Sequence, residues 1–234
     1  MTSPPGRSIA VVIGASGGIG GAIAAALEAQ GRFAQVIRLG RSSEPPLDIT
    51  AEPSIAAAAA QIRAIGHDLR LVFDASGFLH DHRFTPEKSW SQIDPAHMQQ
   101  SFAVNAIGPA LLMKHFLPLL AGDGTSVFAT LSAKVGSIGD NQLGGWYAYR
   151  ASKAALNQIV RTAAVELGRR RPHAICVALH PGTVATGLTA PFAKAGLDVQ
   201  TPEVAAAQLL ALVHRLTPAD SGGFLDRFGE PIPW

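Results

Sequence analysis

The chain has a single cysteine among its 234 residues, so it cannot form an internal disulfide. Cys176 lies in an apolar run that is typical of a buried strand, which indicates neither a redox role nor a metal site. Charged residues are also scarce, at 15%, and the net charge of +2 provides no electrostatic footprint for nucleic acid. The densest basic cluster, Arg169-Arg170-Arg171, is more typical of a helix end. We therefore expect no nucleic-acid partner.

Long uninterrupted apolar stretches are missing as well. The stretch 103–120 contains Asn105, Lys114, His115 and Pro118, which argues against a membrane span. The first eight residues are polar and lack the apolar segment of a secretory signal. We therefore expect a cytoplasmic protein that has no membrane partner.

The hydrophobic share of 47%, with 24 Gly and 16 Pro, indicates a compact protein with many turns. Short apolar runs typical of buried parallel strands occur at 9–13, 35–39, 69–74, 126–131 and 174–179. Longer helical patterns lie between and after them, at 19–30, 54–65, 95–120, 149–170 and 202–216. This alternation predicts an α/β fold with a doubly wound parallel sheet flanked by helices. We expect one domain over 1–234, with a dinucleotide-binding part at 8–131 and a catalytic part at 132–234.

A glycine-rich turn, Gly14-Ala15-Ser16-Gly17-Gly18-Ile19-Gly20, joins the first run to the first helix. Glycine permits a tight turn and lets backbone N–H groups approach a pyrophosphate, which the helix N-terminus favours. A tight strand-to-helix connection alone would also use glycine. The position of the turn after the first strand of an alternating chain favours a Rossmann-type nucleotide site.

The run 35–39 leads into Gly40-Arg41-Ser42 without an acidic residue that could bind a ribose 2′-hydroxyl. Arg41 is placed to meet a 2′-phosphate, so we expect NADP(H) in preference to NAD(H). The alternative is a solvated loop charge. Asp48, followed by Ile49, leaves two interpretations open: it accepts a hydrogen bond from the adenine amino group, or it caps the next helix.

Tyr149 and Lys153 are four residues apart in a helical pattern, which places them on one face. A free phenol has a pKa of about 10, and a nearby positive charge lowers it. Such a pair could exchange protons near neutral pH. Taken alone, the spacing also fits an ordinary amphipathic helix.

With these motifs in order, the chain resembles the short-chain dehydrogenase/reductase family over nearly its whole length. Further landmarks of that family are matched by Ala75-Ser76-Gly77, by Asn105 in Val104-Asn105-Ala106, and by Pro181-Gly182. The turn Gly136-Ser137-Ile138 and the ending Pro231-Ile232-Pro233-Trp234 resemble the branch of bacterial C-factor proteins and the sniffer carbonyl reductase.

The resemblance implies site roles. Tyr149 would be the acid/base, Lys153 would lower its pKa and hold the nicotinamide ribose, and Asn105 would hold a water on the proton path. The implied cofactor-binding residues, besides these three, are Gly14, Ser16, Gly17, Gly18, Ile19, Gly20, Arg41, Asp48, Ile49, Ala75, Ser76, Gly77, Pro181, Gly182, Thr183, Val184 and Thr186. The implied function is NADP(H)-dependent hydride transfer to or from a small carbonyl or alcohol.

One family position departs from the pattern. The serine that orients the substrate carbonyl should stand three residues before Gly136, where this chain has Ala133. We predict that the adjacent Ser132 replaces it, with Ser137 as a weaker candidate. If no serine acts there, the alternative is a C-factor-like nucleotide-binding signalling protein with weak or no catalysis.

Three further expectations concern loops and assembly. His80-Asp81-His82 is predicted to be a solvated loop and not a metal site. The segment 188–197 stands where the family places a lid over substrate. Pairing through the helices predicted at 95–120 and 149–170 would give a homodimer or homotetramer.

Overall fold

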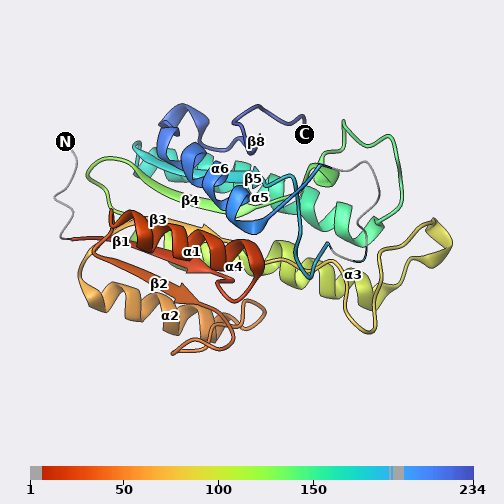
Figure 1. Cartoon of the computed structure of the whole chain (residues 1–234), viewed down its shortest axis with the longest axis horizontal. Coiled ribbons are helices and arrows are strands. Elements are labelled where there is room, and N and C mark those ends of the chain that lie inside the picture. The colour runs from red at the N-terminus through yellow and green to blue at the C-terminus, as the bar shows by residue number, and fades with distance from the viewer. Residues whose placement is uncertain (1–6, 190, 192–197) are drawn as a thin grey trace.

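The computed structural model describes residues 7–189, 191 and 198–234. Six parallel strands form one sheet in the order β2-β1-β3-β4-β5-β8 (Figure 1). They are β1 (Ser8–Ile13), β2 (Gln35–Leu39), β3 (Asp68–Asp74), β4 (Ser126–Leu131), β5 (Ala174–His180) and β8 (Phe224–Asp226). A separate pair is formed by β6 (Thr183–Val184) and β7 (Val199–Gln200).

Helices cover both faces of the sheet. They are α1 (Gly18–Gln30), α2 (Glu52–Ile65), α3 (Pro95–Phe102), α4 (Gly108–Phe116), α5 (Tyr147–Arg170) and α6 (Pro202–Arg215). Ile9 and Val11 of β1 belong to the core beneath α2, α4 and α5, whereas Ala10 belongs to the core beneath α1 and α6. Because both faces are covered, the strands are continuously apolar. The predicted doubly wound α/β fold is confirmed.

The direction of winding reverses at β1. β2 pairs with one side of β1 and β3 with the other, so the carboxyl ends of β1 and β3 flank the reversal point. The Ala75 N–H donates to the Ile13 carbonyl at 2.9 Å and joins these two ends. Ligands of open α/β sheets bind at such a point.

Three elements differ from the sequence prediction. The helix expected at 95–120 is α3, a π-helical turn (Ala103–Ile107), α4 and a 3-10 turn (Leu117–Leu119) in succession. Helix α5 begins at Tyr147, two residues before the predicted start. Strand β8 was not predicted because three residues are too few to show periodicity.

The helical stretch Pro95–Leu119 is long and apolar enough to cross a bilayer by length and composition, with a mean hydropathy of 1.3 over its most apolar window. In this fold it packs against the rest of the protein instead: α3 contacts α5, and α4 contacts α2 and α5. Its apolar side chains Leu112, Met113 and Phe116 belong to the core. These core contacts account for part of the apolar composition of this stretch.

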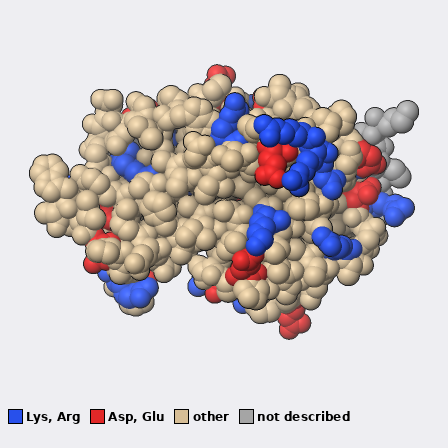
Figure 2. Space-filling view, turned by 180° about the vertical axis from the view of Figure 1, so that it is seen from behind, with Lys and Arg blue, Asp and Glu red and all other residues tan. Residues whose placement is uncertain are grey.

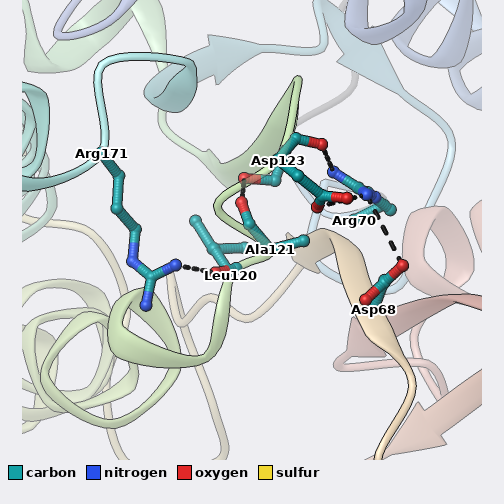
Figure 3. Close-up of polar contacts among 7 residues, drawn as sticks. Asp68, Arg70, Leu120, Ala121, Asp123 and Arg171 are labelled. Atoms are coloured by element: carbon teal, nitrogen blue, oxygen red, sulfur yellow. Dashed lines mark hydrogen bonds and ion pairs between the residues drawn. The ribbon is translucent and has the colours of Figure 1, made fainter. Parts of the chain in front are cut away.

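Two arginines fasten the chain at the end of the sheet opposite the reversal point (Figure 3). Arg70 on β3 donates to the carboxylate of Asp123 at 2.7 Å and to its main-chain oxygen at 2.6 Å. Arg171, just after α5, donates to the carbonyls of Pro118 and Leu120. These contacts hold the loop that leads into β4, whose other end reaches the candidate site.

Charged side chains of both signs are interspersed on the face shown in Figure 2, and much of that face is uncharged. This distribution agrees with the small net charge of +2. The absence of a nucleic-acid partner stays a prediction.

Candidate active site

The glycine turn after β1 is required by close backbone packing. Gly14 has φ 76°, and a Cβ there would lie 3.0 Å from the carbonyl carbon and oxygen of Ala75. A Cβ on Gly20 would lie 2.3 Å from the Gly14 oxygen. Any larger residue would push the turn away from β3 or open the start of α1.

The N-terminus of α1 faces the reversal point without an anion of its own. Gly17 is the N-cap residue, no side chain caps it, and the first turn contains no acidic residue. Ser16, Gly17 and Gly18 are exposed. Unpaired N–H groups at the positive end of a helix bind phosphate. Thr186 packs over Gly18, with its Cγ2 2.9 Å from where a Cβ would stand, and brings the segment after β5 to this end of the helix.

The end of β2 lies beside the glycine turn. Gly40 adjoins Ser16, whose Oγ is 3.7 Å from the Gly40 Cβ position, and Arg41 is exposed beside it. The Asp48 carboxylate accepts from the Thr50 hydroxyl at 2.7 Å and from its N–H at 2.9 Å. These bonds lower the pKa of Asp48, and the charge of Arg41 adds to the effect.

The capping alternative for Asp48 is wrong. Helix α2 begins after Ala51, and no side chain bonds to its cap. Ile49 packs instead against α4, since a Cβ on Gly108 would meet its side chain at 3.0 Å.

The segment after β3 is held by buried polar groups. Asp74 accepts from the Ser76 hydroxyl at 2.6 Å and from the Thr130 hydroxyl at 2.7 Å. Burial raises the pKa of Asp74, while these bonds and the charge of Lys153 act in the opposite direction. Gly77 approaches Asn105, whose Oδ1 would lie 3.9 Å from a Gly77 Cβ. Ala75 and Ser76 thus lie beside the glycine turn, and Gly77 lies beside Asn105.

Asn105 lies in the π-helical turn and is fully buried. Its amide accepts from the Phe78 N–H and donates to the Phe78 carbonyl, each at 2.8 Å, and also donates to the Ser152 hydroxyl at 3.1 Å. The side chain therefore ties the loop after β3 to α5. Its predicted role in holding a water is not tested by these contacts.

Tyr149 and Lys153 lie one turn apart in α5, and both are buried. The Lys153 ammonium donates to the Leu131 carbonyl at 2.8 Å and lies 5.9 Å from the centre of the Tyr149 ring. Among the described residues, the phenol has no hydrogen-bond partner. The Trp146 ring packs edge-on against it at 6.1 Å.

Burial dominates the acid–base balance of this pair. It lowers the pKa of Lys153 to about 8, with the charge of Asp74 acting against it. It raises the pKa of Tyr149 above the ordinary value. Desolvation of the phenolate causes this rise, and the expectation that Lys153 lowers the phenol's pKa stays a prediction.

No hydrogen bond joins Ser132 and Tyr149 among the described residues. The Ser132 hydroxyl is buried and donates to Asn157 Oδ1 at 2.6 Å. Asn157 lies eight residues beyond Tyr149, roughly 12 Å along the helix axis. Ala133 is half-exposed, whereas Ser137 is buried and its hydroxyl accepts from the Asp140 N–H at 3.0 Å. A catalytic role for Ser132 stays a prediction.

The segment after β5 closes the other side of the site. Gly182 has φ 78°, and the Arg227 guanidinium occupies the place of its missing side chain. Gln200 donates to the Pro181 carbonyl, and Thr183 and Val184 pair with β7. Burial, together with the charge of Arg227, lowers the pKa of His180 to about 4, so this imidazole is neutral at pH 7.

Two further predictions concern the loop at residues 80–82 and the lid at residues 188–197. Asp81 accepts from the N–H groups of Arg83 and Phe84, each at 2.8 Å, which makes its loop a turn. No group of three or more metal-binding side chains occurs among the described residues. Most of the predicted lid at 188–197 lies outside the described residues.

Sequence reasoning missed Glu87, His97, Gln200 and Arg227. Glu87 and His97 are buried beside the start of α5, although they lie in loop and polar-helix sequence with no apolar periodicity. Gln200 and Arg227 adjoin Pro181 and Gly182 only because β7 and β8 return there. These positions follow from long-range contacts that spacing does not reveal.

Comparison with known proteins identifies the family. Residues 14–215 match the family described as enoyl-(acyl carrier protein) reductase. The 1-hydroxy-2-glutathionyl-2-methyl-3-butene dehydrogenase of Rhodococcus sp. (strain AD45) is 32% identical, with 97% of this chain and all of that protein aligned. The chain belongs to the short-chain dehydrogenase/reductase family.

Other members support the predicted branch. The C-signal of Myxococcus xanthus is 36% identical over 61% of this chain and 81% of its own. Carbonyl reductase Sniffer of D. melanogaster has the same fold, with a TM-score of 0.83, 23% identity and coverage of 97% and 99%. The NADPH-bound carbonyl reductase from chicken fatty liver aligns with a TM-score of 0.83, 28% identity and the same coverage. The predicted resemblance to the family and to this branch is confirmed.

Proposed function

We propose that this short-chain dehydrogenase/reductase is an NADP(H)-dependent oxidoreductase that interconverts a small carbonyl compound and its alcohol. One observation supports this proposal most: the Lys153 ammonium donates to the Leu131 carbonyl at 2.8 Å, which holds Lys153 and its neighbour Tyr149 at the end of β4. The free N-terminus of α1 lies at the same edge of the sheet. This arrangement supports proton transfer beside a bound dinucleotide.

The residues present fit a dinucleotide. The turn from Gly14 to Gly20 is a backbone cradle that a Cβ would fill, and it offers helix N–H groups to the pyrophosphate. Arg41 and Ser16 would bind the 2′-phosphate, and Asp48 and Ile49 would border the adenine. When bound, NADP(H) supplies or accepts the hydride at the carbonyl carbon. The preference for NADP(H) is supported by Arg41 and by the NADPH-bound relative from chicken.

Tyr149 is protonated at neutral pH, since burial raises its pKa, and this is the form that donates a proton to a carbonyl oxygen. As hydride arrives at carbon, the phenol proton moves to oxygen, and Lys153 stabilises the phenolate left behind. The ammonium is held in place by Leu131. In the oxidative direction the phenolate accepts the alcohol proton.

The proposal is tested by following NADPH oxidation with a panel of aldehydes, ketones and quinones, and NADP⁺ reduction with alcohols that include glutathione conjugates. The last class is included because the Rhodococcus relative is named for such a substrate. We expect turnover with NADPH and a rise of at least about tenfold in the KM for NADPH, but not NADH, in Arg41→Ala. No turnover with any compound would contradict the proposal.

A second function has its own support. Ala133 stands at the position of the family serine, Ser132 is bonded to Asn157, and the C-signal of Myxococcus xanthus is 36% identical. A nucleotide-binding protein with little catalysis fits these facts. Calorimetric binding of NADPH without oxidation in the whole panel would favour this function.

A further inference from the structure

Helix α5, which carries Tyr149, begins without a cap of its own. Trp146 precedes it in a left-handed conformation with φ 54°, and no side chain caps the helix from that position. Tyr147, Ala148 and Tyr149 are its first three residues. Their N–H groups need acceptors from elsewhere, because the first turn of a helix has none within itself.

Glu87, from the loop between β3 and α3, supplies one of these acceptors and a further bond just before the helix. Its main-chain oxygen accepts from the Trp146 N–H at 2.5 Å, and its carboxylate Oε2 accepts from the Ala148 N–H at 3.3 Å. Gly145 has φ 65° and allows the backbone before α5 to approach Glu87 closely, since a Cβ at Gly145 would lie 3.1 Å from the Glu87 main-chain oxygen. A carboxylate at a helix N-terminus also interacts favourably with the helix dipole.

His97, on α3, fixes this carboxylate from the other side. Its Nδ1 lies 3.1 Å from Glu87 Oε1, and each residue is only 2% exposed. Glu87 Oε1 has no hydrogen-bond partner among the described residues, so this close contact does not have hydrogen-bond geometry. The imidazole is stacked on Phe84 with ring centres 5.0 Å apart and meets the edge of Phe78 at 6.1 Å.

A buried pair of ionisable groups contributes little to the stability of the fold, because the cost of desolvation offsets the attraction between them. Glu87, however, accepts from the N–H of Ala148, which is one residue from Tyr149 along α5. We propose that Glu87 is a positioning residue that sets the place of the Tyr149 phenol by capping α5, and that His97 orients Glu87. The inference rests on the proposed acid/base role of Tyr149 and adds Glu87 and His97 as the residues that position its phenol.

The test uses a property of this sequence: Tyr147 and Tyr149 are its only tyrosines. In protein labelled with 3-fluorotyrosine, the ¹⁹F resonance of Tyr149, assigned with Tyr147→Phe, reports its surroundings without any turnover. Glu87→Ala removes the carboxylate, Glu87→Gln keeps an acceptor oxygen, and His97→Phe keeps the ring stacking but not Nδ1. Glu166→Gln, an exposed change on the same helix, is the control. kcat and the KM for NADPH are measured in parallel.

We expect Glu87→Ala and His97→Phe to move or broaden the Tyr149 resonance and to lower kcat at least about tenfold, with the KM for NADPH within about threefold. Glu87→Gln and Glu166→Gln should retain at least about a third of the wild-type kcat and a wild-type resonance. If Glu87→Ala does not fold, His97→Phe decides. If the wild type turns over no substrate, the proposed function fails and the resonance alone decides the positioning role. An unmoved resonance in folded Glu87→Ala or His97→Phe would overturn the inference, as would an equal loss of kcat in Glu87→Gln.

Discussion

At the scale of single residues, burial shifts the pKa values of both Tyr149 and Lys153. The pKa of Lys153 falls to about 8 because its ammonium is desolvated. The unfolded chain has the ordinary lysine value of about 10.5 and therefore binds more protons between these two pH values. The stability contribution of Lys153 must rise with pH in this window and be lost as pH falls toward 8.

This gives a prediction for Lys153→Met without NADPH. Between pH 7 and 9.5 the free energy of unfolding of the wild type should rise by about 1–2 kcal/mol relative to that of the variant. Denaturant unfolding at several pH values measures it. A constant difference would mean that Lys153 is hydrated and that its pKa is ordinary.

Ser132 offers a second test at this scale. Ser132→Ala leaves the buried Asn157 oxygen without its donor, so we expect a loss of about 1–3 kcal/mol in unfolding free energy. Because the hydroxyl is directed to Asn157, kcat should change less than about threefold at a temperature where the variant is folded. A tenfold fall in kcat would instead support the catalytic role that the sequence predicts.

At the scale of elements, the glycine turn between β1 and α1 joins local conformation to binding. We expect Gly14→Ala to weaken NADPH binding at least about tenfold, since the new Cβ would displace the turn from Ala75. Gly31→Ala is the matched control: φ is 61° there too, but nothing lies within 4 Å of a Cβ. It should cost about 1–2 kcal/mol of stability and leave the affinity unchanged. Calorimetric titration would show equal affinities if the turn does not bind the dinucleotide.

Elements with strong periodicity were predictable, and those that depend on distant partners were not. Strand β1 was predictable from its continuous apolar run, and the turn after it was predictable because glycine permits a tight connection between a strand and a helix. The break in the helix at 103–107 was invisible, because Ala103–Ile107 is apolar and helical in composition while its π-turn follows from packing of Asn105 on the loop after β3. The direction of the Ser132 hydroxyl likewise depends on Asn157, which belongs to another element.

At the scale of the whole molecule, the outer face of α5 is a candidate for self-association. Val165 is 47% exposed there, and a groove beside it is lined by Arg161, Glu166 and Arg169. The family resemblance implies pairing through the helices at 95–120 and 149–170, so we expect light scattering to give at least about twice the 24.3 kDa of one chain. Val165→Arg should shift the mass toward one chain. A wild-type monomer would contradict this prediction.

The fold positions Tyr149, on α5, at the same edge of the sheet where α1 begins. The most direct test is the initial rate of NADPH oxidation by Tyr149→Phe beside its neighbour Tyr147→Phe, with the best substrate of the panel. Removal of the proton donor should lower kcat by about 10²–10⁴-fold, with NADPH affinity retained, while Tyr147→Phe stays within about threefold of wild type. Equal activity of Tyr149→Phe and wild type would contradict the proposed acid/base role.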